Sequence, residues 1–161
     1  CLLLIYGKTY KTQVPLYLSS KNVNVVLDTL LPKQEQFSFV DLGSGCGGLL
    51  NNLAKVHKNG LFYGIESAPL PLLISKLRSL PNHGSCQIFW GSFWEYDLSQ
   101  YDVVYAYLSP IPMESLWRKV SKEMRPGSLL ISNTFLIPGV TPHKSIQLND
   151  FSNSTLYLWK I

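Results

Sequence analysis

The chain has 161 residues, 46% of them hydrophobic, and a formal net charge of +4. This length predicts one domain with a core of its own, and the apolar content is ordinary for a globular protein. The positive charge is spread along the chain and forms no basic run with interleaved aromatic residues, which speaks against a dedicated nucleic-acid surface. A basic solvated surface accounts for the charge, and an acidic or membrane-surface partner stays open.

The chain contains three cysteines, Cys1, Cys46 and Cys86, whose spacing matches no metal site. An odd and widely separated set of cysteines predicts no disulfide framework. The same set indicates a reducing compartment, cytoplasmic or matrix-like. No metal is expected in the site.

The beginning of the chain is expected to form an N-terminal arm, residues 1–18, ahead of a domain over residues 19–161. Its first residue is Cys rather than Met, which indicates a trimmed or processed form. The apolar run from Leu2 to Ile5 is far shorter than the roughly 20 residues that a helix needs to span a bilayer. It is either the end of a longer hydrophobic segment, which would anchor the protein to a membrane, or a short arm packed on the domain.

From residue 23 onward, apolar periodicity and breaker residues predict strands that alternate with helices. Gly60, in the sequence Lys58-Asn59-Gly60, is expected to cap the second helix. The alternation predicts a parallel, doubly wound α/β sheet, followed by two terminal strands that form an antiparallel hairpin. The predicted helices are 23–31, 49–57, 69–80 and 113–123, and the predicted strands are 37–42, 61–66, 85–91, 101–108, 128–135, 145–150 and 155–161.

A glycine-rich turn joins the first of these strands to the second helix, in the sequence FVDLGSGCGG from Phe39 to Gly48. A strand, a tight glycine turn and a helix N-terminus together let the backbone approach a nucleotide-like ligand closely. The N–H groups at the helix N-terminus add the positive end of a dipole. This turn is therefore the predicted ligand site.

Two classes of ligand fit the turn. Gly43-x-Gly45-x-x-Gly48 satisfies the dinucleotide fingerprint, with Glu66 at a suitable separation to contact a ribose. Asp41 instead completes the pattern D-x-G-x-G-x-G, and its carboxylate would repel a pyrophosphate but suits the ammonium and sulfonium of S-adenosylmethionine. With this acid the turn resembles motif I of class I methyltransferases. A NAD-dependent Rossmann enzyme and a non-catalytic cofactor-binding protein are the alternatives.

The resemblance implies a seven-stranded Rossmann-like sheet that binds S-adenosyl-L-methionine, and the terminal hairpin agrees with it. Glu66 would accept hydrogen bonds from both ribose hydroxyls. Ser92 and Phe93 follow the third strand, where methyltransferases hold the adenine, and Leu108 ends the fourth strand, which faces the methyl group. The predicted cofactor-binding residues are Asp41, Gly43, Ser44, Gly45, Gly47, Glu66, Ser92, Phe93 and Leu108.

A closer resemblance covers about Val14 to Pro138. Its main elements are Trp94, Asp97-Leu98-Ser99-x-Tyr101, Pro110, Phe135 and Pro138. With them the stretch is similar to the small family of lysine N-methyltransferases that includes the mitochondrial enzymes for the ATP synthase c-subunit and the adenine nucleotide translocase. The resemblance implies a protein lysine as methyl acceptor and a hydrophobic segment ahead of the domain.

Methyl transfer from an activated sulfonium needs positioning and exclusion of water rather than covalent help. Tyr107, Ser109 and Pro110 are predicted to supply these where the fourth strand ends, and Ser109-Pro110-Ile111-Pro112 partly matches the [DN]-P-P-[FYW] tetrad of amino methyltransferases. Aromatic faces can hold a charged amine before transfer. Small molecules and nucleic acids stay open as acceptors. Further candidate walls of the acceptor site are Tyr10, Tyr17 and Phe135.

Overall fold

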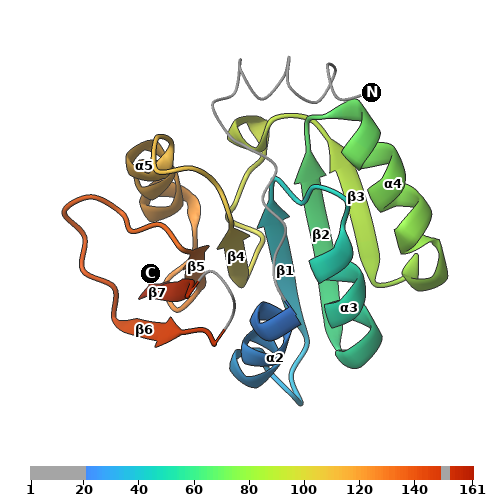
Figure 1. Cartoon of the computed structure of the whole chain (residues 1–161), viewed down its shortest axis with the longest axis horizontal. Coiled ribbons are helices and arrows are strands. Elements are labelled where there is room, and N and C mark those ends of the chain that lie inside the picture. The colour runs from blue at the N-terminus through green and yellow to red at the C-terminus, as the bar shows by residue number, and fades with distance from the viewer. Residues whose placement is uncertain (1–20, 150–152) are drawn as a thin grey trace.

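The central strand β1 (Phe37–Leu42) belongs to a seven-stranded sheet of order β3-β2-β1-β4-β5-β7-β6 (Figure 1). The computed structural model describes residues 21–149 and 153–161. Strands β1 to β5 run parallel, whereas β7 pairs antiparallel with both β5 and β6. The predicted sheet and its terminal hairpin are thereby confirmed. The other strands are β2 (Gly60–Glu66), β3 (Cys86–Trp90), β4 (Val103–Ala106), β5 (Leu129–Asn133), β6 (Lys144–Gln147) and β7 (Thr155–Lys160).

Helices cover both faces of this sheet, and each face has its own apolar core. The helices are α2 (Lys21–Leu30), α3 (Gly48–Val56), α4 (Pro69–Ser79) and α5 (Met113–Glu123), with 3-10 turns η1 (Leu80–Asn82) and η2 (Phe93–Glu95). The core beneath α2 and α3 contains Phe39, Phe62 and Tyr105. The opposite core is built around α5 and contains Val40, Val104 and others.

Two local expectations differ from the structure. The fourth strand covers only Val103–Ala106 instead of 101–108, because its pairing with β1 ends where β1 itself ends, at Leu42. Gly60 does not cap α3: His57 ends that helix, and its N–H donates to the carbonyl of Leu53. Gly60 opens β2 instead, where a Cβ would lie 2.7 Å from the rings of Phe37 and Phe62.

No helix within residues 21–149 and 153–161 has the length and apolar content needed to cross a membrane. The predicted arm, residues 1–18, and the candidate walls Tyr10 and Tyr17 lie outside the described residues.

Gly64 offers a test of how tightly β2 packs beneath the glycine turn. A Cβ at this position would lie 2.6 Å from Ser44 Oγ, 2.7 Å from Leu50 Cδ1 and 2.9 Å from Ile88 Cδ1. Overpacking of this kind costs about 2 kcal/mol, so we expect Gly64→Ala to lower the free energy of unfolding by that amount in urea titration. Gly84→Ala is the control, because no atom lies within 4 Å of its Cβ position. Equal stability of the two variants would contradict this packing.

Candidate active site

The glycine turn folds back over the end of β2. Gly43, Gly45 and Gly47 have φ angles of 77°, 54° and 69°, a left-handed conformation that side chains other than hydrogen rarely tolerate. The N–H groups of Gly43 and Ser44 both donate to the carbonyl of Ile65, at 2.9 and 3.1 Å. The turn is therefore anchored to β2 before α3 begins at Gly48.

Glu66 ties this turn to the loop that follows β2. Its Oε2 accepts a hydrogen bond from the N–H of Gly45 at 2.8 Å, and its Oε1 accepts one from the N–H of Ala68 at 2.6 Å. The sequence predicted a ribose contact for this carboxylate and did not reveal its second role as a clamp on the backbone. Each oxygen has a further lone pair, so the clamp does not preclude a ligand hydrogen bond.

α4 packs closely against the same turn from outside. A Cβ on Gly47 would lie 2.2 Å from Ser75 Oγ, so Gly47 is required by space as well as by its φ angle. Arg78 of α4 donates from Nη1 to the carbonyl of Cys46 at 3.2 Å, and Asn51 of α3 donates from Nδ2 to the carbonyl of Gly47 at 2.8 Å. None of these supports was predicted, and the contacts of Ser75 and Arg78 join residues from separate elements.

Ser44 does not point toward a ligand above the turn. Its Oγ is buried against β2, 2.6 Å from the position that a Cβ of Gly64 would take, and no described residue forms a hydrogen bond with it. A contact between Ser44 and a cofactor would therefore have to use its backbone.

Asp41 lies at the end of β1, 6% exposed, beside Glu66, which is 7% exposed. Burial, and to a lesser extent the nearby Glu66 charge, raise the pKa of Asp41 from 3.8 to about 8. Within the described chain, no lysine, arginine or histidine forms an ion pair with it. The site thus presents a buried acid that lacks a positive partner of its own.

The end of β3 lies next to the end of β2, because the N–H of Gly91 donates to the carbonyl of Glu66 at 3.1 Å. Ser92 and Phe93, the predicted adenine contacts, follow directly. Ser92 is the residue before η2, and its side chain forms no capping bond. Phe93 is half-buried and packs on Trp94, with ring centroids 4.6 Å apart. Both residues therefore follow β3, which is separated by β2 from β1 and the glycine turn.

The residues after β4 divide between the two faces of the sheet. Leu108 is buried on the α5 side and lies 3.3 Å from the position that a Cβ of Gly43 would take. Tyr107 packs on the opposite side, against the core beneath α2 and α3. Ser109 is buried and Pro110 is exposed. Leu108 is thus brought to the glycine turn, whereas Tyr107 and Leu108 project to opposite faces.

A buried polar pair at the ends of β4 and β5 was missed by the sequence analysis. Asn133 Nδ2 donates to the hydroxyl of Tyr105 at 3.0 Å, and both residues are almost fully buried. The next residue, Thr134, has a φ of 73°, which is strained for a β-branched residue, and its hydroxyl donates to Asn133 Oδ1 at 3.0 Å. The sequence did contain a sign of this pair, because the apolar run of β5 ends with the amide of Asn133.

These features together suit a positively charged ligand that lies close to the backbone of the glycine turn. Two buried carboxyls favour a cation, and left-handed glycines allow its close approach. Residues 21–149 and 153–161 contain no group of histidine, cysteine, aspartate and glutamate side chains arranged to hold a metal ion.

Comparison with known proteins identifies the family. A family model described as the ANTKMT methyltransferase domain matches residues 41–144, which include the end of β1, the glycines that follow it and strands β2 to β5. The chain belongs to this family. It is an S-adenosylmethionine-dependent methyltransferase, as the acid before the glycines predicted. A protein-lysine N-methyltransferase of Saccharolobus islandicus is 31% identical over 124 residues, which is 75% of this chain and 77% of that protein.

Solved structures agree on the fold of this methyltransferase. An RNA methyltransferase from Salinibacter ruber, in complex with S-adenosyl-L-homocysteine, superposes with a TM-score of 0.81 at 24% identity, covering 90% of this chain and 94% of its own. A precorrin-6y C5,15-methyltransferase from Geobacter metallireducens gives a TM-score of 0.68 at 14% identity, covering 89% and 90%. At these identities the likeness shows the fold and leaves the acceptor open.

The raised pKa of Asp41 predicts how stability depends on pH. The unfolded chain releases this proton near pH 3.8 and the folded chain near pH 8, so stability falls as pH rises between these values. We expect Asp41→Asn to remove that slope and to raise the free energy of unfolding by roughly 2–4 kcal/mol at neutral pH. Urea titration across this pH range measures both effects. A variant less stable than the wild type at neutral pH would contradict the buried, unpaired state of Asp41.

Proposed function

We propose that this methyltransferase transfers a methyl group from S-adenosylmethionine to a lysine side chain of a protein. The observation that carries the proposal is the Saccharolobus islandicus relative, a protein-lysine N-methyltransferase matched over 75% of this chain. The roles of individual residues given below belong to the same proposal.

In this proposal Asp41 and Glu66 bind different parts of the cofactor. The Asp41 carboxylate attracts its positively charged part, and Glu66 accepts hydrogen bonds from the ribose while its clamp on Gly45 and Ala68 persists. Phe93 packs on the face of the adenine, and Ser92 forms a hydrogen bond with its edge. The cofactor supplies an activated methyl group when bound, and the protein has to align an acceptor with it.

The acceptor is expected where β4 and β5 end. Ser109 is buried there, and Tyr107 and Phe135 are half-buried aromatic side chains. A lysine that enters this region loses hydration, which lowers its pKa and favours the neutral amine needed for attack. Aromatic faces hold the ammonium form before that proton leaves. The buried Tyr105–Asn133 pair keeps the backbone beneath these residues in place.

The role of Asp41 predicts a pH-dependent affinity for the cofactor. Only ionised Asp41 attracts a cation, so affinity should strengthen as pH rises toward about 8 and level off above it. Asp41→Asn should weaken binding about 100-fold and remove this pH dependence. Isothermal titration calorimetry in buffers of different ionisation enthalpy measures both the affinity and the proton released on binding.

Two comparisons sharpen this titration. S-adenosylhomocysteine lacks the sulfonium charge, so a preference for S-adenosylmethionine that disappears in Asp41→Asn would locate the sulfonium near Asp41. Glu35→Gln removes an exposed acid elsewhere and should leave binding unchanged. Equal affinity of wild type and Asp41→Asn at every pH would exclude the assigned role.

The acceptor can be identified by label transfer. The wild-type protein and Asp41→Asn, each with tritiated S-adenosylmethionine, are incubated with soluble and membrane fractions of a lysate. We expect tritium in methyl-lysine after acid hydrolysis of the protein fraction, with the wild type only. Tritium in RNA or in a small metabolite, and none in protein, would exclude a lysine acceptor while leaving methyl transfer established.

A further inference from the structure

α4 presents its leucines to solvent. Leu73 and Leu77 of α4 are 56% and 59% exposed, and Leu80, which follows α4 directly as the first residue of η1, is 62% exposed. Their spacing of four and three residues aligns them on one side of the helix. The side chains that α4 buries are small or polar: Pro71, Ser75 and Ser79. The usual amphipathic arrangement of a surface helix is therefore reversed here. In Figure 1, α4 is the outermost helix, at the β3 edge of the sheet.

The leucines form an arc bordered by cations. At 100° per residue, Leu80, Leu73 and Leu77, followed by the partly exposed Leu70 and Ile74, cover about 120° of the helix surface. Lys76 falls just beyond one border of the arc and Arg78 just beyond the other. We call the side chains of these seven residues the α4 face.

The surroundings of the α4 face carry no opposing charge. The chain has no aspartate or glutamate between Glu66 and Glu95, a stretch that includes α4, η1 and β3 as well as His83. At the end of β3, Trp90 is 66% exposed, and strand alternation places it on the same side of the sheet as Ile88, the side that α4 covers.

We propose that the α4 face binds a lipid surface that carries anionic headgroups. An exposed apolar arc flanked by lysine and arginine is the arrangement of helices that lie in the membrane interface, with leucines in the acyl boundary and cations at the headgroups. Tryptophan also favours that interface. The proposal does not depend on the identity of the methyl acceptor, and the residues varied in its test, Leu73, Leu77 and Lys76, have no role assigned in the active site.

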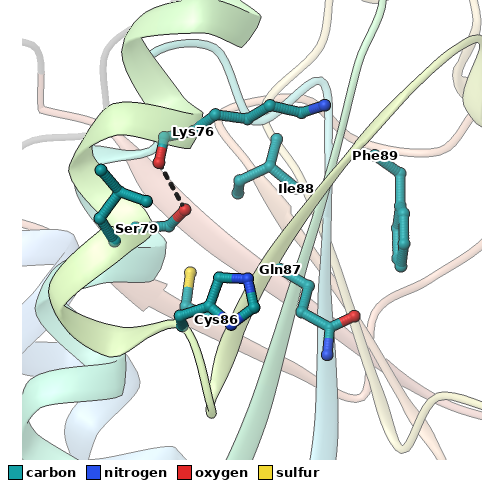
Figure 2. Close-up of a pocket in the computed structure, with 8 residues that line it drawn as sticks. Lys76, Ser79, Cys86, Gln87, Ile88 and Phe89 are labelled. Atoms are coloured by element: carbon teal, nitrogen blue, oxygen red, sulfur yellow. Dashed lines mark hydrogen bonds between the residues drawn. The ribbon is translucent and has the colours of Figure 1, made fainter.

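Charge decides against a second copy of the chain as the occupant. Two α4 faces packed together would oppose Lys76 and Arg78 with their own copies and supply no acid to pair them. A protein segment bound in the neighbouring groove would not cover the exposed leucines of α4. That groove, about 400 Å³, lies between α4 and β3 (Figure 2), and it is lined by Leu80 but not by Leu73 or Leu77. Lys76 extends across the groove toward Phe89, so its side chain borders both the groove and the α4 face.

Sedimentation with vesicles tests the proposal. The full chain is mixed with vesicles of phosphatidylcholine alone, or of phosphatidylcholine with phosphatidylglycerol, at low and high salt. We expect binding to the anionic vesicles that weakens with salt. The double variant Leu73→Gln/Leu77→Gln should bind about tenfold more weakly, and Lys76→Gln about fivefold more weakly. All variants keep residues 1–20, so differences among them report on the α4 face.

The control is Val25→Gln, which replaces an apolar residue of α2 that is 65% exposed. It should bind as the wild type does. Sedimentation velocity without vesicles gives the second measurement. Absence of vesicle binding, or equal binding by Leu73→Gln/Leu77→Gln and Val25→Gln, overturns the proposal. A dimer that Leu73→Gln/Leu77→Gln dissociates, without vesicle binding, also overturns it and assigns the face to a second copy.

Discussion

Two carboxyl groups buried at the ends of neighbouring strands are the constraint on which this site depends. Glu66 satisfies its oxygens with backbone N–H groups from the loops after β1 and β2, so it holds the glycine turn in place. Asp41 has no such partner among the described residues and keeps its proton until about pH 8. The difference matters for function. Glu66 organises the site before any ligand arrives, whereas under the proposed function the free energy lost by burying Asp41 would be recovered when the cation of the cofactor binds beside it.

The strand order explains why these groups meet. From β1 the chain adds β2 and then β3 on one side, and it then crosses to the other side of β1 to form β4. Open α/β sheets bind their ligands at such a topological switch point. The ends of β1, β2 and β4 therefore surround one space, with Leu108 against Gly43 and Glu66 against Gly45. The antiparallel β7 completes the sheet beside β5 and leaves the end of β5, with Asn133, next to β4. One topology thus brings the glycine turn and the expected acceptor region to the same edge.

The sequence was sufficient to predict elements with a regular apolar period. It was insufficient to predict features that depend on close contact between residues far apart in the chain. β1 and α5 have the predicted bounds because their apolar spacing is unbroken, and the acid before the glycines identified the cofactor class. Gly60 was misassigned because a cap and a crowded strand position both select glycine, and only the rings of Phe37 and Phe62 distinguish them. Ser44 points inward against Gly64 of β2, and Asn133 of β5 binds Tyr105 of β4. Both contacts join residues far apart in the sequence, and the periodicity of a single sequence carries no information on such pairs.

The same close approach accounts for the composition of α4. To support the glycine turn, the helix must come within van der Waals contact of Gly47, so only small side chains such as Ser75 fit between them. That requirement explains why the side chains of α4 nearest the turn are small, while Leu72 packs against the core beside them, but it places no demand on the outer side, where any polar residue would serve the fold. Three exposed leucines there lower solubility and add nothing to the core. Their position between Lys76 and Arg78, in a stretch without acids, is what the proposed contact with an anionic lipid surface would use.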